Sequence, residues 1–160
     1  PGRDERARAE EALGRVGLAA FADNRFDRLS GGQRQLALLA RALATGSSTI
    51  VFDEPTAALD IRNERLVLEL MARLRNSRAH ELVFTTHDPN HALCVADDAL
   101  LMMPEGDIVH GPSESTITEA NMLRLFGAPM RMIAMEARAD VPASRHLIPE
   151  PITINPENRC

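Results

Sequence analysis

The sequence predicts an α/β fold in which a parallel sheet is flanked by helices. Two short apolar runs, at residues 49–52 and 82–86, are typical of strands that are buried on both faces of a parallel sheet. Segments with the apolar spacing of helices alternate with these runs along the chain. With 160 residues and 44% hydrophobic content, the chain is long enough to bury a core.

Three helices are predicted in the first half of the chain. The first covers residues 3–16 and ends at Gly17, the second begins after Ser30, and the third begins near Asp60. Each has apolar residues at intervals that place them on one face. The residues expected to face inward are Ala9, Leu13 and Val16 in the first helix, Leu36, Leu39, Ala40 and Leu43 in the second, and Leu66, Leu70 and Leu74 in the third.

The second half combines short helices with hairpins. Asp88 and Pro89 fit the N-cap and first position of a helix, and Gly106 fits the tight turn of a hairpin. Thr118 predicts the N-cap of a last helix that Gly127 ends. The remaining expectations are hairpin strands at 99–103 and 108–110, a helix at 119–126, pairing of 130–137 with 146–148, and a loose tail at 149–160.

Composition argues against several classes of function. The net charge of −5 speaks against a nucleic-acid-binding surface, because phosphate backbones demand a basic face. No stretch approaches the roughly 18 to 20 apolar residues that span a bilayer, so we expect a membrane role to come through a partner. All 18 basic residues are arginine, and without lysine the chain holds no phosphate-binding loop of the G-x-x-x-x-G-K-[ST] type.

The first candidate site is the helix start Leu29-Ser30-Gly31-Gly32-Gln33. Two glycines let the backbone approach a ligand closely, and free N–H groups together with the helix dipole favour an anion such as phosphate. The alternative from local chemistry alone is a plain helix cap.

The second candidate is the pair Asp53 and Glu54, which an apolar strand delivers to its carboxyl end. Ligands bind at this edge of open α/β sheets. Mg²⁺ suits one carboxylate, and Glu54 could then orient and deprotonate an attacking water. The alternative is that the two acids cap the following turn.

The third candidate is His87, which follows the second strand and precedes a helix. Its imidazole could donate a hydrogen bond to a terminal phosphate or satisfy a loop carbonyl. Taken alone, the residue does not decide between the two.

These motifs occur in the order and approximate separation seen in ATP-binding-cassette (ABC) ATPases. Leu29 to Gln33 resembles the signature motif, Thr49 to Glu54 the Walker B strand, Ala57 to Asp60 the D-loop, and His87 the switch histidine. The resemblance covers residues 1–127. It implies that these residues form the C-terminal part of a P-loop NTPase (ABC ATPase) fold, including part of the helical signature subdomain. Residues 128–160 are expected to add a C-terminal β-hairpin and a loose tail.

The resemblance implies ATP and Mg²⁺ as cofactors, and a head-to-tail dimer with a second ABC ATPase subunit. It implies that Asp53 binds the metal and that Glu54 and His87 are catalytic. The residues implied to contact the nucleotide of the partner subunit, or to reach across the interface, are Ser30, Gly31, Gly32, Gln33 and Asp60. ABC ATPases also carry a Walker A loop before the first helix; we therefore expect this chain to be a fragment that alone neither binds ATP tightly nor hydrolyses it.

A finer resemblance concerns the cargo. Asp88-Pro89-Asn90-His91-Ala92, Gly111-Pro112 and residues 118–127 are similar to the ATPases of iron-siderophore, haem and vitamin B12 importers. This implies a cytoplasmic subunit, held at the inner face of the membrane by permease subunits and served indirectly by a substrate-binding protein. Two alternatives stay open: an ABC ATPase without a transport role, and a non-catalytic remnant that dimerises with or regulates an intact cassette.

Overall fold

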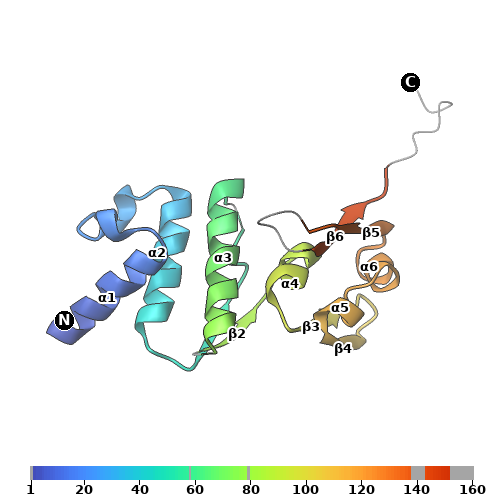
Figure 1. Ribbon diagram of the computed structural model, residues 1–160, viewed down its shortest axis with the longest axis horizontal. Coiled ribbons are helices and arrows are strands. Elements are labelled where there is room, and N and C mark those ends of the chain that lie inside the picture. The colour runs from blue at the N-terminus through green and yellow to red at the C-terminus, as the bar shows by residue number, and fades with distance from the viewer. Residues whose placement is uncertain (1, 58, 79, 138–142, 152–160) are drawn as a thin grey trace, which may run out of the picture. The chain divides into compact units, whose positions relative to one another are not determined.

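The computed structural model describes residues 2–57, 59–78, 80–137 and 143–151 (Figure 1). The chain divides into two compact units, Pro1–His87 and Asp88–Cys160. All of the predicted site residues belong to the first unit. The predicted division into segments 1–127 and 128–160 stays a prediction.

The first unit consists of helices followed by a strand, a helix and a second strand. Its regular elements are α1 (Arg3–Arg15), the short 3₁₀ helices η1 (Ala19–Phe21) and η2 (Phe26–Arg28), α2 (Gly31–Ala44), β1 (Thr49–Phe52), α3 (Ile61–Ser77) and β2 (Glu81–Phe84). The two strands pair in parallel, with Ile50 opposite Leu82 and Phe52 opposite Phe84. The predicted α/β class and the parallel pairing are confirmed.

The prediction that both faces of these strands are buried is wrong for the residues described. Side chains alternate between the faces of a strand. Ile50 and Phe52 are 4% and 7% exposed, whereas Val51 is 69% and Val83 is 54% exposed. One face of the β1–β2 pair therefore packs into the unit, and the other is uncovered among the residues described.

The inward face of α2 is the predicted one. Leu36, Leu39, Ala40 and Leu43 are all buried. In α1 the prediction for Ala9 is wrong, because Ala9 is exposed and Ala12 is buried together with Val16. Residues 12 and 16 lie one turn apart on the same row of the helix, and this row packs towards α2.

The inward face of α3 is shifted by one position from the prediction at its start. Leu66 is 38% exposed, whereas Val67 is fully buried. The buried set Val67, Leu70, Met71 and Leu74 follows the spacing i, i+3, i+4, i+7. Leu66 lies beside this row, since one residue turns the helix by about 100°.

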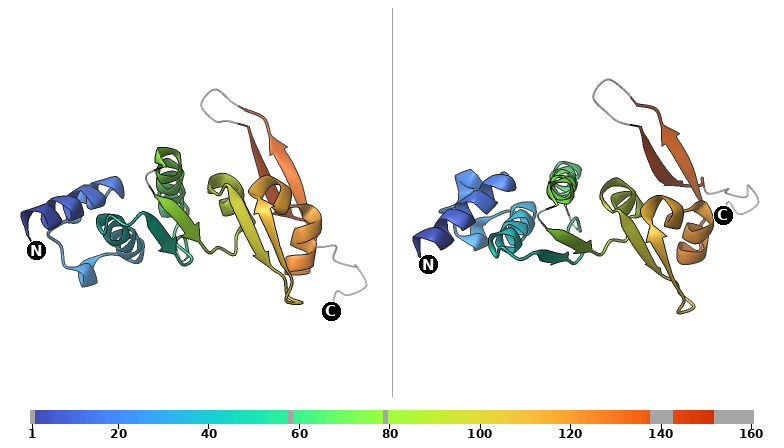
Figure 2. Two further views of the ribbon diagram at one scale, coloured as in Figure 1. Left: turned by 90° about the horizontal axis from the view of Figure 1, so that it is seen from below. Right: turned by 60° about the horizontal axis from the view of Figure 1, so that its bottom comes forward.

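The second unit holds two antiparallel hairpins and three helices in its described residues (Figure 2). Its elements are α4 (Pro89–Val95), β3 (Asp98–Met102), β4 (Ile108–Pro112), α5 (Ser113–Thr116), α6 (Glu119–Phe126), β5 (Met130–Met135) and β6 (Ser144–Pro149). The predicted caps are present: the side chains of Asp88 and Thr118 accept from backbone N–H groups, and Gly127 ends α6 with φ of 67°.

An apolar cluster joins the two hairpins to the helices of the second unit. Leu101, Met103, Ile117, Met122 and Leu147 are each 9% exposed or less. Arg124 on α6 donates to Glu105 and Asp107 in the turn of the β3–β4 hairpin. These hydrogen bonds raise the pKa of the Arg124 guanidinium, and the bond to Glu105 contributes most. The turn is thus pinned to α6 as well.

Side chains from two helices grip the β5–β6 hairpin at one level. Met132 and Leu147 are directly opposite partners. The side-chain amide of Asn90 donates to the Leu147 carbonyl (3.0 Å) and accepts from the Leu147 N–H (2.7 Å). On the other strand, the Met132 N–H donates to Glu119 (2.6 Å). The N–H and carbonyl of Leu147 thus point away from β5, as in a non-hydrogen-bonded antiparallel pair. A side chain of α4 binds the outer edge of β6, and a side chain of α6 binds the outer edge of β5.

The C-terminal tail is only partly described. Pro149, expected in a loose tail, ends β6, and the N–H of Glu150 donates to the Pro129 carbonyl (3.0 Å). Residues 152–160 lie outside the described residues. Within the described part of the chain, no helix has the length and apolar character needed to cross a membrane.

Candidate functional site

The carboxyl ends of β1 and β2 bring three predicted site residues to one edge. Because the strands are parallel, the residues that follow them emerge on the same side. The N–H of Thr85 donates to the Phe52 carbonyl (3.0 Å) and so extends the pairing by one residue. Asp53 and Glu54 follow β1 at this edge, and His87 follows β2.

The hydroxyl of Thr85 connects the two strand ends. Thr85 Oγ1 donates to Asp53 Oδ1 (2.6 Å) and accepts from the backbone N–H of Glu54 (3.0 Å). One side chain therefore orients the carboxylate of Asp53 and the peptide of Glu54. Sequence reasoning gave Thr85 no role, although a hydroxyl residue at the end of a strand adjacent to Asp53 was the available signal.

Glu54 and His87 form a side-chain pair. His87 Nδ1 lies 2.9 Å from Glu54 Oε2. The backbone of Glu54 has φ of 45°, a left-handed conformation that residues other than glycine seldom adopt. Such a conformation costs of order 1–3 kcal/mol and is held by its surroundings, which include the Thr85 hydrogen bond to the Glu54 N–H.

The pair fixes which ring nitrogen carries a proton. An ionised carboxylate only accepts, so Nδ1 of His87 is the donor towards Glu54. In the neutral ring Nε2 is then an acceptor, and donation from Nε2 to a phosphate oxygen requires either the doubly protonated ring or release from Glu54. The contact with Glu54 thus bears on which ring nitrogen His87 presents to a ligand.

This edge is open to solvent and to a ligand. The side chain of His87 is 76% exposed and that of Glu54 is 35% exposed, and Asp53 is also exposed. Among the described residues, no group of three His, Cys, Asp or Glu side chains could hold a metal ion. A single carboxylate nevertheless fits Mg²⁺, which is usually held by one or two carboxylates together with phosphate oxygens and water.

The predicted glycine-containing helix start forms a complete capping box. Ser30 Oγ accepts from the N–H of Gln33 (3.2 Å), and the Gln33 side chain accepts from the N–H of Ser30 (2.9 Å). Gly31 and Gly32 lie in the first turn of α2, whose N–H groups point out of the helix end. The cap predicted for Ser30 is present; the roles of these four residues at a nucleotide stay predictions.

Asp60 is placed against the same helix start through Asn63. Asp60 caps α3 by accepting from the Asn63 N–H (2.8 Å), and it also accepts from Asn63 Nδ2 (3.0 Å). A β-carbon built on Gly32 would lie 2.6 Å from Asn63 Nδ2. The predicted residues thus form two groups in the contacts described: Asp53, Glu54 and His87 with Thr85, and Gly32 and Asp60 with Asn63.

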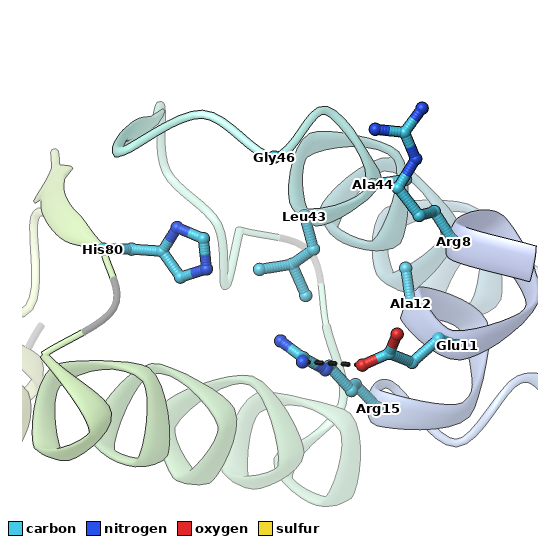
Figure 3. Close-up of a pocket in the computed structure, with 8 residues that line it drawn as sticks. All are labelled: Arg8, Glu11, Ala12, Arg15, Leu43, Ala44, Gly46 and His80. Carbon is cyan, nitrogen blue, oxygen red and sulfur yellow. Dashed lines mark hydrogen bonds and ion pairs between the residues drawn. The ribbon is translucent and has the colours of Figure 1, made fainter. Parts of the chain in front are cut away.

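A hollow in the first unit lies elsewhere and contains none of the predicted site residues (Figure 3). Leu43 and His80 point into it, and the Arg15 guanidinium donates to Glu11 (2.8 Å) at its rim. The Nδ1 atom of His80 lies 2.8 Å from the carbonyl oxygen of Ser47. The side chains of Glu11, Arg15 and His80 are thus engaged within the chain, and we assign the site to the strand edge on chemical grounds.

The sequence of the chain is similar to those of known proteins. The family model described as ABC transporter matches residues 3–57. The chain is 41% identical over 122 residues to the molybdate import ATP-binding protein MolC of Haemophilus influenzae, covering 76% of this chain and 48% of the relative. It is 35% identical over 130 residues to the hemin import ATP-binding protein HmuV of Rhodococcus jostii, covering 81% and 44%.

A solved structure agrees in fold. A metal-chelate type ABC transporter in an inward-facing conformation matches with a TM-score of 0.84 and 36% identity, over 93% of this chain and 58% of that chain. The chain spans about half the length of the curated relatives it matches. By sequence and by fold, the chain is thus similar to the ATP-binding proteins of ABC transporters.

Proposed function

We propose that this chain provides the catalytic strand edge and the signature helix of an ATP-hydrolysing cassette that powers an importer. The observation that carries the proposal is the network in which Thr85 orients Asp53 and Glu54 while Glu54 holds His87. Phosphoryl transfer to water depends mainly on positioning and charge stabilisation. A rigid edge with an acid, a second acid and an imidazole suits that task.

Glu54 is the group that orients and deprotonates the attacking water. Its backbone is held by Thr85, so the carboxylate starts from a fixed point at the end of β1. His87 leaves Glu54 to donate to the terminal phosphate, which frees the carboxylate for the water. The 2.9 Å contact between the two side chains is then the resting arrangement of the edge.

Asp53 would hold Mg²⁺, and the bound ion would neutralise charge on the phosphate oxygens. Ser30, Gly31, Gly32 and Gln33 present backbone and side-chain groups to the nucleotide of a second cassette, and Asp60 reaches across the interface. These assignments make the active unit a head-to-tail dimer, because one chain supplies only part of each nucleotide site.

The transport role is proposed from the relatives. The two curated relatives are named for import of molybdate and of hemin, and the solved structure for a metal chelate. A cassette assembled from this chain would bind permease subunits at the cytoplasmic face of the membrane and drive import of a metal-containing chelate, such as an iron-siderophore, haem or cobalamin compound. A substrate-binding protein would deliver this cargo from outside.

The test is Glu54→Gln in a complete cassette, made by joining this chain to the phosphate-binding half of the Haemophilus relative. Glutamine keeps the size of the side chain and removes the base. ATP binding should persist, while turnover should fall by about 10²- to 10⁴-fold. Binding and turnover are measured by calorimetry and phosphate release.

The matched control is Glu69→Gln on α3, where the glutamate pairs with Arg65 on an exposed helix face. Such solvent-exposed pairs contribute little to stability, so turnover should stay close to that of the parent. Parent-level turnover in Glu54→Gln would remove Glu54 from the role of base and would contradict the proposed assignment of this edge.

A further inference from the structure

Of the two glycines at the helix start, only Gly32 lacks room for a β-carbon. A β-carbon built on Gly31 would meet nothing within 4 Å. On Gly32 it would lie 2.6 Å from Asn63 Nδ2 and 3.3 Å from Asn63 Cγ. The space that a larger residue would need at position 32 is therefore occupied by the Asn63 side-chain amide.

The same amide is bonded to Asp60. Asn63 Nδ2 donates to Asp60 Oδ2 (3.0 Å), while Asp60 Oδ1 accepts from the Asn63 backbone N–H (2.8 Å). The second bond alone is sufficient for an ordinary N-cap. The side-chain bond is additional, and it is made by the atom that lies against Gly32.

We propose that Asn63 is a positioning residue that couples Gly32 of the signature helix to Asp60 of the following loop. Its amide fills the gap between the two, so that a displacement at Gly32 moves Asn63 and thereby the carboxylate of Asp60. This rests on the proposed function, in which Gly32 and Asp60 both act at the interface with a second cassette. Asn63 then keeps these two groups in register as they meet the partner.

The proposal gives Gly32 a second requirement besides close approach to phosphate. Alanine at position 31 should slightly stabilise α2, because alanine favours helices more than glycine does. Alanine at position 32 should lose this gain, since its methyl group must displace Asn63 from Asp60. The two neighbouring glycines should thus respond oppositely to the same change.

The first experiment uses the full chain without nucleotide. The hydrogen exchange and the NMR signals of the Asn63 side-chain amide are compared in Gly31→Ala and Gly32→Ala. Gly32→Ala should shift the side-chain signals and speed exchange about 2- to 10-fold, the range for loss of one hydrogen bond. Gly31→Ala should leave both unchanged. Equal responses in the two variants would overturn the proposal.

A double-mutant cycle checks the cause. Asn63→Ala removes the obstructing amide, so Gly32→Ala should raise the unfolding midpoint in the Asn63→Ala background while failing to raise it in the parent chain. Additive effects would show that Gly32 and Asn63 are not coupled, and would overturn the proposal. Because neither measurement needs ATP, both remain decisive if the cassette proves inactive.

The second experiment tests positioning in the complete cassette. Asn63→Asp still fills the space beside Gly32 but cannot donate to Asp60, and its charge repels that carboxylate. Turnover should fall several-fold while KM for ATP stays the same, because the phosphate-binding half is untouched. Parental turnover in Asn63→Asp would overturn the positioning role. A parent cassette without turnover would instead contradict the proposed function.

Discussion

The two units of the chain use polar side chains in different ways. At the strand edge of the first unit, Thr85, Asp53, Glu54 and His87 bond mostly to one another and are accessible to solvent. In the second unit, Asn90 makes part-buried hydrogen bonds to the backbone of Leu147, which is 2% exposed. Exposed bonds between side chains can be exchanged for water or a ligand at little cost, whereas bonds beside a packed core cannot. The first arrangement suits chemistry and the second suits docking of a hairpin.

The largest effect should come from the core of the second unit. Met122 is fully buried, and Met122→Ala should lower the free energy of unfolding of this unit by about 2–5 kcal/mol through lost burial and a cavity. Denaturant unfolding measures the change. Met102→Ala is the control, since Met102 is 75% exposed and its truncation should cost less than about 0.5 kcal/mol. Equal costs for the two would contradict the assigned core.

The docking of the β5–β6 hairpin gives two isosteric changes with different expected results. Asn90→Asp loses the donor to the Leu147 carbonyl and places a charge beside Asp88, which should cost about 1–3 kcal/mol. Glu119→Gln keeps an acceptor for the Met132 N–H and should cost no more than about 1 kcal/mol, largely the lost charge at the start of α6.

Amide exchange at Leu147 and Met132 is the measurement for this pair of variants. Asn90→Asp keeps an acceptor for the Leu147 N–H, so the faster exchange expected there reports weaker docking of the hairpin as a whole. Exchange at Met132 should change little in Glu119→Gln. The reverse pattern would show that the hairpin is not held by these side chains.

The strand edge of the first unit should respond more weakly in stability. Thr85→Val keeps the shape of the side chain but removes the hydroxyl that bonds Asp53 and the Glu54 N–H. Because water can replace part of the loss at an exposed edge, the cost should be about 1–2 kcal/mol. Exchange of the Glu54 amide should speed up, whereas Thr85→Ser, which keeps the hydroxyl, should preserve its protection. Unchanged exchange of the Glu54 amide in Thr85→Val would contradict the proposed role of the Thr85 hydroxyl.

The smallest effect is expected on the uncovered face of β1. Val51 is 69% exposed, so Val51→Thr in this chain should change the free energy of unfolding by less than about 0.5 kcal/mol. The neighbouring change Ile50→Thr buries a hydroxyl at a 4% exposed position and should cost about 1–3 kcal/mol or more. Similar costs at both positions would show that both faces are covered.

Much of this fold follows from local patterns in the sequence. The Ser30 capping box, the Asp88 and Thr118 caps and the hairpin turn at Gly106 depend on residues within a few positions of one another. The meeting of Asp53 and His87 at one edge could also be predicted, because parallel strands end on the same side.

Other features depend on contacts that sequence patterns do not encode. Thr85 and Asn63 matter through residues on other elements, Asp53 and Gly32 respectively, so their neighbours cannot be inferred from spacing. The predictions for Ala9 and Leu66 fail because an apolar stripe on a helix is broad, and the packing partner decides which row is buried. The exposure of Val51 depends on which elements cover the sheet, which an apolar run alone does not reveal.

At Glu54, the left-handed backbone lowers stability, whereas the length of the side chain determines where its carboxylate lies. Aspartate and asparagine adopt such angles more readily than glutamate, so Glu54→Asp would relax the main chain. The same change would shorten the side chain by one methylene and withdraw the carboxylate from the imidazole it now meets. Glu54 thus combines a strained backbone with a side chain long enough to contact His87. Selection for stability alone would favour its replacement and would remove the carboxylate that we propose as the base.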